Sequence, residues 1–141
     1  MDLSIGELAR RTGVKVPTIR YYEQIGLLPA PPRTEGQQRR YGKAAVARLS
    51  FIRHSRELGF EVEAIRTLVS LQDDPDQSCA TADQIAKTHL VEVEKRIASL
   101  TALRSELQRM VEECACGRVA ECRVIETLAD SGHRHGRLHD F

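Results

Sequence analysis

The sequence contains no tryptophan, and only three tyrosines and three phenylalanines occur among its 141 residues. Aromatic side chains contribute much of the buried area in protein cores, so the core that this chain can build alone is modest. Hydrophobic residues nevertheless make up 41% of the chain. The composition favours one small globular domain with an extended element that a partner helps to bury, and it argues against a large enzyme with a deep pocket.

Long apolar runs are also missing. No stretch approaches the roughly 18 apolar residues that a membrane-spanning helix needs, and no signal peptide precedes the first predicted helix. We therefore expect a cytoplasmic protein. In that reducing compartment the cysteines favour a metal or redox site over disulfide bonds; they are Cys79, Cys114, Cys116 and Cys122.

The net charge is only +1, yet the two halves of the chain differ in sign. Residues 1–72 contain 12 Lys and Arg against 7 Asp and Glu, a balance of +5. Residues 73–141 contain 9 against 13, a balance of −4. The N-terminal half is therefore the part suited to bind a polyanion such as DNA.

The segment from Cys79 to Cys122 predicts an unusually long helix with one cysteine at its start and three at its end. Cys79 and Cys114 are 35 positions apart, so a continuous helix separates them by roughly 50 Å and one chain cannot bring them together. Two antiparallel chains can, because the start of one helix then lies beside the end of the other. The seam has the spacing of a coiled coil, interrupted by Arg104, and consists of Ala86, Leu90, Val93, Ile97, Leu100, Leu107 and Val111. A long helix packed on its own domain is the alternative.

The N-terminal third predicts a helix-turn-helix. Ser4 and Glu7 have the spacing of a capping box that starts a first helix, and Gly13 ends it. Pro17 suits the first turn of a second helix, the one that enters a DNA major groove in such motifs. A short two-stranded wing is expected around Gly36, where basic and aromatic residues suited to phosphate contact gather: Arg33, Arg39, Arg40 and Tyr41. A solvated basic loop is the alternative for this segment.

Three more helices besides the long one are expected in the rest of the chain. Apolar spacing predicts one from Lys43 to near Gly59, one over residues 62–71, and a short one over residues 124–128. The expected domains are a DNA-binding winged helix-turn-helix over residues 1–75, a dimerisation helix over 76–113, and a metal-binding loop, short helix and His-containing tail over 114–141.

Several different short motifs are spread along the chain, and their combination is highly specific for one protein family. They are Ile5-Gly6-Glu7-Leu8-Ala9, Thr18-Ile19-Arg20-Tyr21-Tyr22-Glu23, Gly26-Leu27-Leu28, Arg33, Arg39-Arg40-Tyr41 and Leu58-Gly59-Phe60. The chain resembles the MerR family of bacterial transcription regulators in these residues. The resemblance implies an all-α fold with a small β wing, in which a winged helix-turn-helix domain is joined to a long antiparallel coiled-coil dimerisation helix.

The resemblance also implies which residues contact DNA. On the second helix the candidates are Lys15, Thr18, Arg20 and Tyr21, with Tyr22 expected to be half buried. On the wing they are Arg33, Arg39 and Tyr41, which would contact phosphates. The wing departs from the commonest family pattern, because Gln37 and Gln38 stand where Gly and Tyr usually precede the Arg-x-Tyr.

Thiolates are soft ligands that bind Zn, Cd, Pb, Hg or Cu(I) in deprotonated form, and Cys114 and Cys122 bracket a loop wide enough to fold around one ion. In metal-sensing members of the family, two loop cysteines at these places are ligands. The start of the partner's helix supplies Cys in divalent-metal sensors and Ser in copper sensors; here that position is Cys79. The resemblance thus implies a site for a divalent metal effector, Zn, Cd or Pb, shared between two chains.

Several alternatives stay open at this sensor end. Cys116 could be a fourth ligand in a tetrahedral thiolate set or a spare thiol. The residues His133, His135 and His139 could form an auxiliary metal site or a solvated tail. The loop also resembles part of the iron-sulfur loop in the redox-sensing branch, although a cluster held in one loop needs four cysteines and this loop has three.

The predicted function is that of a homodimeric, metal-responsive regulator that represses without metal and activates with it. The resemblance implies that it distorts promoter DNA into a shape that RNA polymerase can use. Iron-sulfur, Hg(II) and organic or electrophile signals are the alternatives within the family. A thiol enzyme would need a nucleophile with a base beside it, and no such pattern appears. A metal-storage protein would bind metal without affecting transcription.

Overall fold

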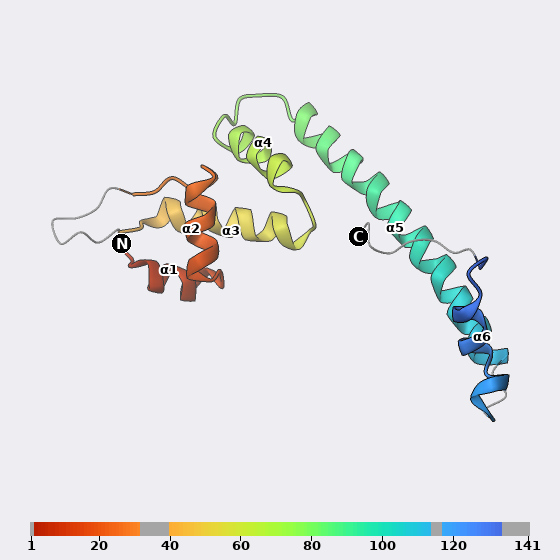
Figure 1. Cartoon of the computed structure of the whole chain (residues 1–141). Coiled ribbons are helices and arrows are strands. Elements are labelled where there is room, and N and C mark those ends of the chain that lie inside the picture. The colour runs from red at the N-terminus through yellow and green to blue at the C-terminus, as the bar shows by residue number, and fades with distance from the viewer. Residues whose placement is uncertain (1, 32–39, 114–116, 134–141) are drawn as a thin grey trace. The chain divides into compact units, whose positions relative to one another are not determined.

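The computed structural model describes residues 2–31, 40–113 and 117–133, most of which are helical. The helices are α1 (Ile5–Thr12), α2 (Val16–Gln24), α3 (Lys43–Glu57), α4 (Val62–Gln72), α5 (Ala80–Glu113), the 3-10 helix η1 (Val119–Glu121) and α6 (Arg123–Ala129), shown in Figure 1. Residues 1–85 and 86–141 form two compact units, called here the first and the second unit. In the described part of the chain, no helix has the length and hydropathy to cross a membrane.

Local sequence explains the bounds of α1 and α2. The Ser4 hydroxyl accepts a hydrogen bond from the Glu7 amide at 3.2 Å, and the Glu7 carboxylate accepts one from the Ser4 amide at 3.3 Å, which forms the predicted capping box. The hydrogen bonds from Ser4 hold the pKa of Glu7 below its usual value. Gly13 ends α1 with a φ of 75°, a conformation that glycine adopts without strain. Pro17 lies in the first turn of α2, as predicted.

The first unit has one continuous apolar core, to which α1, α2, α3 and α4 all contribute. α3 packs against both α1 and α4. The side chains with no exposed surface are Leu8, Ile19, Leu49, Ile52 and Ile65. An antiparallel β-bridge between Leu3 and Tyr41, with two N–H···O distances of 2.8 Å, ties the N-terminal segment to the residues before α3. The core therefore comes from one chain.

Tight turns connect α4 to the start of α5. The Gln77 amide donates to the Asp74 carbonyl at 3.1 Å, and the Ser78 hydroxyl accepts from the first amide of α5 at 3.2 Å. The guanidinium of Arg48 on α3 pairs with the carboxylate of Asp73, the residue that follows α4. These contacts attach the segment before α5 to the rest of the first unit.

The second unit contains most of α5, together with η1 and α6. α5 continues for 34 residues, about 50 Å at the rise of an α-helix. Met110 is its one buried residue. The large apolar residues that remain exposed on α5 are Leu90, Val91, Ile97, Leu100, Leu107 and Val111. This helix therefore carries apolar surface that its own unit does not cover.

The predicted fold class is confirmed by this helical architecture and by the long α5. The helices expected before the acidic segment at residues 73–76 are present, and the short helix expected over residues 124–128 is α6. The 3-10 helix η1 was not predicted. The expected wing falls mainly on residues 32–39, which lie outside the described residues.

Candidate DNA interface and metal ligands

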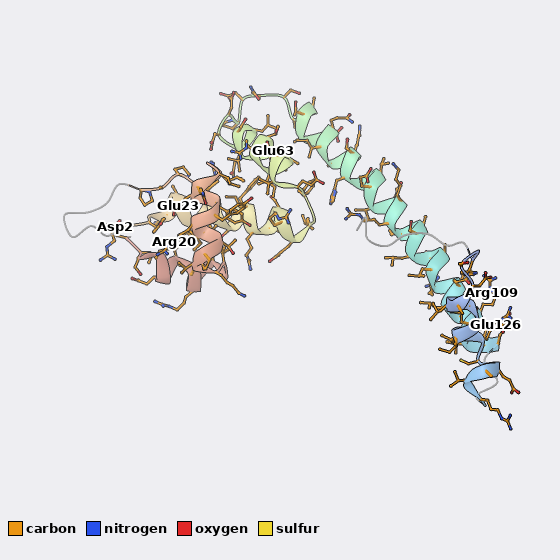
Figure 2. The ribbon with its side chains drawn as sticks, viewed as in Figure 1. Asp2, Arg20, Glu23, Glu63, Arg109 and Glu126 are labelled. Atoms are coloured by element: carbon orange, nitrogen blue, oxygen red, sulfur yellow. The ribbon has the colours of Figure 1, made fainter. Side chains whose placement is uncertain are left out.

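α2 has one buried and one exposed face. Ile19 has no exposed surface, and Tyr22 is 8% exposed, so it lies deeper in the core than the half-buried position expected from the sequence. The predicted DNA contacts lie elsewhere on the helix: Lys15, Arg20 and Tyr21 are exposed and Thr18 is partly exposed. Figure 2 labels Arg20 on this helix. The burial pattern thus leaves the four candidate side chains accessible to a ligand.

The charge on this surface suits an anion. Lys15 is the N-cap residue of α2, and the first turn of the helix contains no acidic residue. The first amide groups of a helix lack partners within the helix and carry a partial positive charge. Arg20 adds a second cation and Tyr21 adds a phenolic hydroxyl, groups that donate to phosphates and base edges.

Tyr41 is predicted to contact phosphate, but the structure places it inside the first unit. The side chain is 1% exposed, and its hydroxyl donates to a carboxylate oxygen of Glu23 at 3.0 Å. Together with the backbone bridge to Leu3, this hydrogen bond joins the residues before α3 to α2. Tyr41 is therefore not accessible to a phosphate in this conformation. The other two wing candidates, Arg33 and Arg39, lie outside the described residues.

Cys79 and Cys122 each directly precede a helix. Cys79 is exposed, and its carbonyl accepts from the Asp83 amide in the first turn of α5 at 2.9 Å. Cys122 is partly buried; its amide donates to the Val119 carbonyl and its carbonyl accepts from the Glu126 amide, both at 3.0 Å. Neither cysteine is in a disulfide. Helix starts therefore fix the backbone at both thiols, and such thiols suit a soft divalent ion.

The other predicted ligands are Cys114, Cys116, His135 and His139, and all four lie outside the described residues. His133 is described, and its Nε2 atom lies 2.7 Å from a carboxylate oxygen of Glu106. Among residues 2–31, 40–113 and 117–133, no group of three or more His, Cys, Asp and Glu side chains is placed to hold a metal ion. The described part of one chain therefore supplies two of the predicted thiol ligands, each at the start of a different helix.

An apolar groove of about 440 Å³ runs along the C-terminal half of α5. Leu100, Leu103, Leu107 and Val111 form its apolar lining, and Arg104, Gln108 and Glu112 also line it. Leu100, Leu107 and Val111 belong to the seam predicted from the sequence, whereas Leu103 was not predicted. Exposed apolar surface of this kind marks an interface.

The sequence interpretation missed a set of ion pairs around α6. The guanidinium of Arg123, the first residue of α6, lies 2.7 Å from the carboxylate of Glu113, the last residue of α5. This hydrogen bond is the main cause of a raised pKa for Arg123. The opposite charges are visible in the sequence, but their pairing follows only once the bounds of the two helices are known.

The chain is similar to known proteins in sequence and in structure. The family model described as "MerR HTH family regulatory protein" matches residues 3–72, and the one described as "MerR, DNA binding" matches residues 46–110. The HTH-type transcriptional regulator HmrR of Rhizobium leguminosarum bv. viciae is 40% identical over 128 residues, 91% of this chain and 98% of that protein. The regulator ZntR of Escherichia coli K12 is 42% identical over 128 residues, 88% of this chain and 90% of that protein. The crystal structure of PbrR691 from Ralstonia metallidurans CH34 in complex with lead(II) matches with a TM-score of 0.77 and 35% identity, over 90% of this chain and 99% of that one.

Proposed function

Because this chain belongs to the MerR family of DNA-binding transcription regulators, we propose that it is a homodimer that represses its promoter without metal and activates it with a bound divalent metal ion, Zn, Cd or Pb. The family consists of transcription regulators and not of enzymes. In this proposal residues 1–75 bind DNA in the cytoplasm and residues 76–113 dimerise. Residues 114–141 sense the metal together with Cys79.

The observation that carries the proposal is the arrangement of thiols and apolar residues along α5. Cys79 precedes this helix of about 50 Å, and the cysteine-containing segment with Cys122 follows it. The apolar residues between them are exposed in one chain, as at Val111 with 70% of its surface exposed. Antiparallel pairing of two α5 helices buries this surface and brings Cys79 of one chain beside Cys122 of the other.

The proposed metal ligands are Cys79 of one chain and Cys114 and Cys122 of the other, with Cys116 as an additional ligand and with His133, His135 and His139 as an auxiliary site. Three or four thiolates suit soft divalent ions, and their binding requires deprotonated sulfur. The lead(II) complex of PbrR691 supports this class of ion. So does the 36% identity to the "Heavy metal-dependent transcription regulator 2" of Rhizobium meliloti. When bound, the ion would supply a bond across the dimer boundary.

DNA contact in the proposal comes from the exposed face of α2, with Lys15, Thr18, Arg20 and Tyr21, and from Arg33 and Arg39 on phosphates. Two dimer states with different placements of the DNA-binding units would hold the promoter in two shapes. A site shared by the two chains can differ in affinity between these states, and this difference sets how far the metal shifts the equilibrium. RNA polymerase would use the promoter only in the shape that the metal-bound dimer stabilises.

Cysteine-to-serine variants in a promoter-linked reporter test this proposal. Cys79→Ser, Cys114→Ser and Cys122→Ser should each abolish induction by metal and leave operator binding in a gel shift unchanged. Cys116→Ser is the matched variant in the same loop, and the extent of its loss shows whether this thiol is a ligand. Full induction in Cys79→Ser or Cys122→Ser would rule out the proposed site.

A titration of the reduced protein without oxygen identifies the class of metal. Zn, Cd and Pb should bind tightly, whereas Hg(II) as the sole inducer of the reporter would favour the alternative of a mercury-responsive regulator. The 36% identity to the mercuric resistance operon regulatory protein of Bacillus cereus is the reason to include Hg(II). An iron-sulfur absorption spectrum in fresh protein would contradict the proposal and support a redox sensor instead.

A further inference from the structure

Ion pairs join the two residues that flank the cysteine-containing segment 114–122. Glu113 is the last residue of α5 and Arg123 the first residue of α6. The Arg123 Nε atom lies 2.7 Å from the Glu113 carboxylate, and its Nη1 atom lies 3.0 Å from the carboxylate of Glu126 in the first turn of α6. One guanidinium therefore contacts carboxylates on both helices, through two of its nitrogen atoms.

A second contact holds the residues after α6 on the same face of α5. The His133 Nε2 atom lies 2.7 Å from the Glu106 carboxylate, which also pairs with Arg109 at 3.1 Å. Glu106 and Glu113 are seven positions apart, two turns of the helix, and so lie on one face with Met110 between them. Met110 is only 8% exposed. Figure 2 labels Arg109 on α5 and Glu126 on α6 in this region.

This face borders the apolar groove on α5. A cavity of about 330 Å³ lies between α5 and the segment 123–133, and Met110 is the one apolar residue in its lining. Leu107 and Val111 of the groove lie about 60° and 100° around the helix from Met110, because each residue turns the helix by about 100°. Leu103 of the groove is seven positions from Met110, so the proposed interface lies next to the contacts of α6.

The position of Cys122 depends on this docking of α6. Cys122 is the residue before Arg123, and consecutive Cα atoms are about 3.8 Å apart. Its carbonyl accepts the hydrogen bond from the Glu126 amide in the first turn of α6. The ion pair that holds Arg123 at the end of α5 thus also holds the backbone of Cys122 near it.

We infer that the Glu113–Arg123–Glu126 contacts position Cys122 for metal binding, by holding the start of α6 at the end of α5 before the metal arrives. This inference rests on the proposed function, in which Cys122 is a ligand. A ligand whose backbone is already held in place loses less conformational freedom when its thiol binds an ion, so the affinity of the site for the ion is higher. Arg123 and Glu113 are positioning residues here, and neither is a ligand.

The affinity of the full-length, reduced dimer for zinc, measured by competition with a chelator, tests the inference. Arg123→Gln and Glu113→Gln should each weaken binding by about two- to fivefold, the range expected for an exposed ion pair. The double variant Glu113→Arg with Arg123→Glu re-forms the Glu113 pair with reversed charges, and it should bind zinc more tightly than Glu113→Arg alone, in which two cations face each other. The difference in zinc affinity between Arg123→Gln and the unmodified protein should become smaller at high ionic strength, because salt screens exposed charges.

Lys95→Gln is the matched control. It removes a cation from the ion pair with Glu92 on the same helix, at 3.6 Å and far from α6 in sequence, and should leave zinc affinity unchanged. All variants should keep the dimer mass and the operator affinity without metal. Zinc affinity within experimental error of the unmodified protein in both Arg123→Gln and Glu113→Gln would overturn the inference, as would a double variant that binds zinc no more tightly than Glu113→Arg alone.

Cys122→Ser separates this inference from the proposed function. If Cys122→Ser loses tight zinc binding while Arg123→Gln retains it, Cys122 is a ligand and only the positioning role is wrong. If Cys122→Ser binds zinc as tightly as the unmodified protein, the proposed site itself is wrong and the inference falls with it.

Discussion

The two units of this protein differ in what holds them together. In the first unit twelve apolar side chains form a buried cluster to which four short helices contribute. In α5, the longest helix, only Met110 is buried, and Leu90, Ile97, Leu100, Leu107 and Val111 are each at least half exposed. An ion pair between Arg123 and Glu113 joins α6 to α5. The first unit thus buries its apolar core within one chain, whereas α5 leaves apolar surface exposed, which in our proposal a second copy of the chain covers.

The largest expected effect comes from the core of the first unit. Leu49→Ala removes a side chain with no exposed surface and should lower the free energy of unfolding by about 2–5 kcal/mol. The loss should not depend on protein concentration, since the core belongs to one chain. Leu58→Ala, at a residue that is 60% exposed, is the matched control and should change stability little. If the two substitutions lowered stability equally in thermal unfolding, the buried core would not be what stabilises the first unit.

A charge in the apolar groove should break the dimer and spare the first unit. Leu107→Glu would place a carboxylate in the proposed interface, and we expect the dimer dissociation constant to rise by roughly tenfold or more. Sedimentation over a range of concentrations measures this constant. Ala98→Glu, on the opposite side of α5, should leave it unchanged. A Leu107→Glu variant that stays dimeric at low concentration would show that this groove is not the interface.

Tyr41 offers a test of burial against DNA contact. Tyr41→Phe removes the hydroxyl that donates to Glu23 and should lower the free energy of unfolding by about 1 kcal/mol without changing operator affinity. Tyr21→Phe is the matched substitution on a side chain that is 49% exposed. It should weaken operator binding and leave the free energy of unfolding unchanged. The reverse pattern would restore Tyr41 to the DNA interface.

The smallest effect concerns pH and the start of α1. The pKa of Glu7 in the folded chain is lowered from its ordinary value of 4.5, mainly by the hydrogen bond with the Ser4 side chain. Folding therefore favours ionised Glu7, and its contribution to stability is present above pH 4.5 and is lost as the pH falls through the lowered pKa. Ser4→Ala should reduce stability at pH 7 more than at pH 3, in urea unfolding at the two values. An equal loss at both would contradict this linkage.

Most of the helical architecture could be predicted from the sequence because its signals are local. Ser4 and Glu7 form the capping box, and Pro17 indicates the start of α2. The acidic segment 73–76 indicates the end of α4. The exposed apolar seam on α5 could also be predicted, because apolar residues spaced alternately by four and three positions can be recognised in the sequence of one chain.

Contacts between distant residues could not be predicted in the same way. In the sequence Tyr41 follows two arginines. Only the fold shows that its hydroxyl donates a hydrogen bond to Glu23, 18 positions earlier. The ion pair between Arg123 and Glu113 depends on where α5 ends and where α6 begins. Of the predicted ligands, Cys79 and Cys122 are described at helix starts, and the ligand set as a whole stays a prediction.

The most direct test of the shared metal site uses mixed dimers. Chains with Cys79→Ser and chains with Cys122→Ser each form homodimers without a complete site. A dimer with one chain of each kind, isolated by two different affinity tags, contains one complete site only if Cys79 and Cys122 act from opposite chains. We expect this mixed dimer to bind zinc at half the stoichiometry of the unmodified dimer and with the same affinity. No tight binding in the mixed dimer would contradict a site shared between chains.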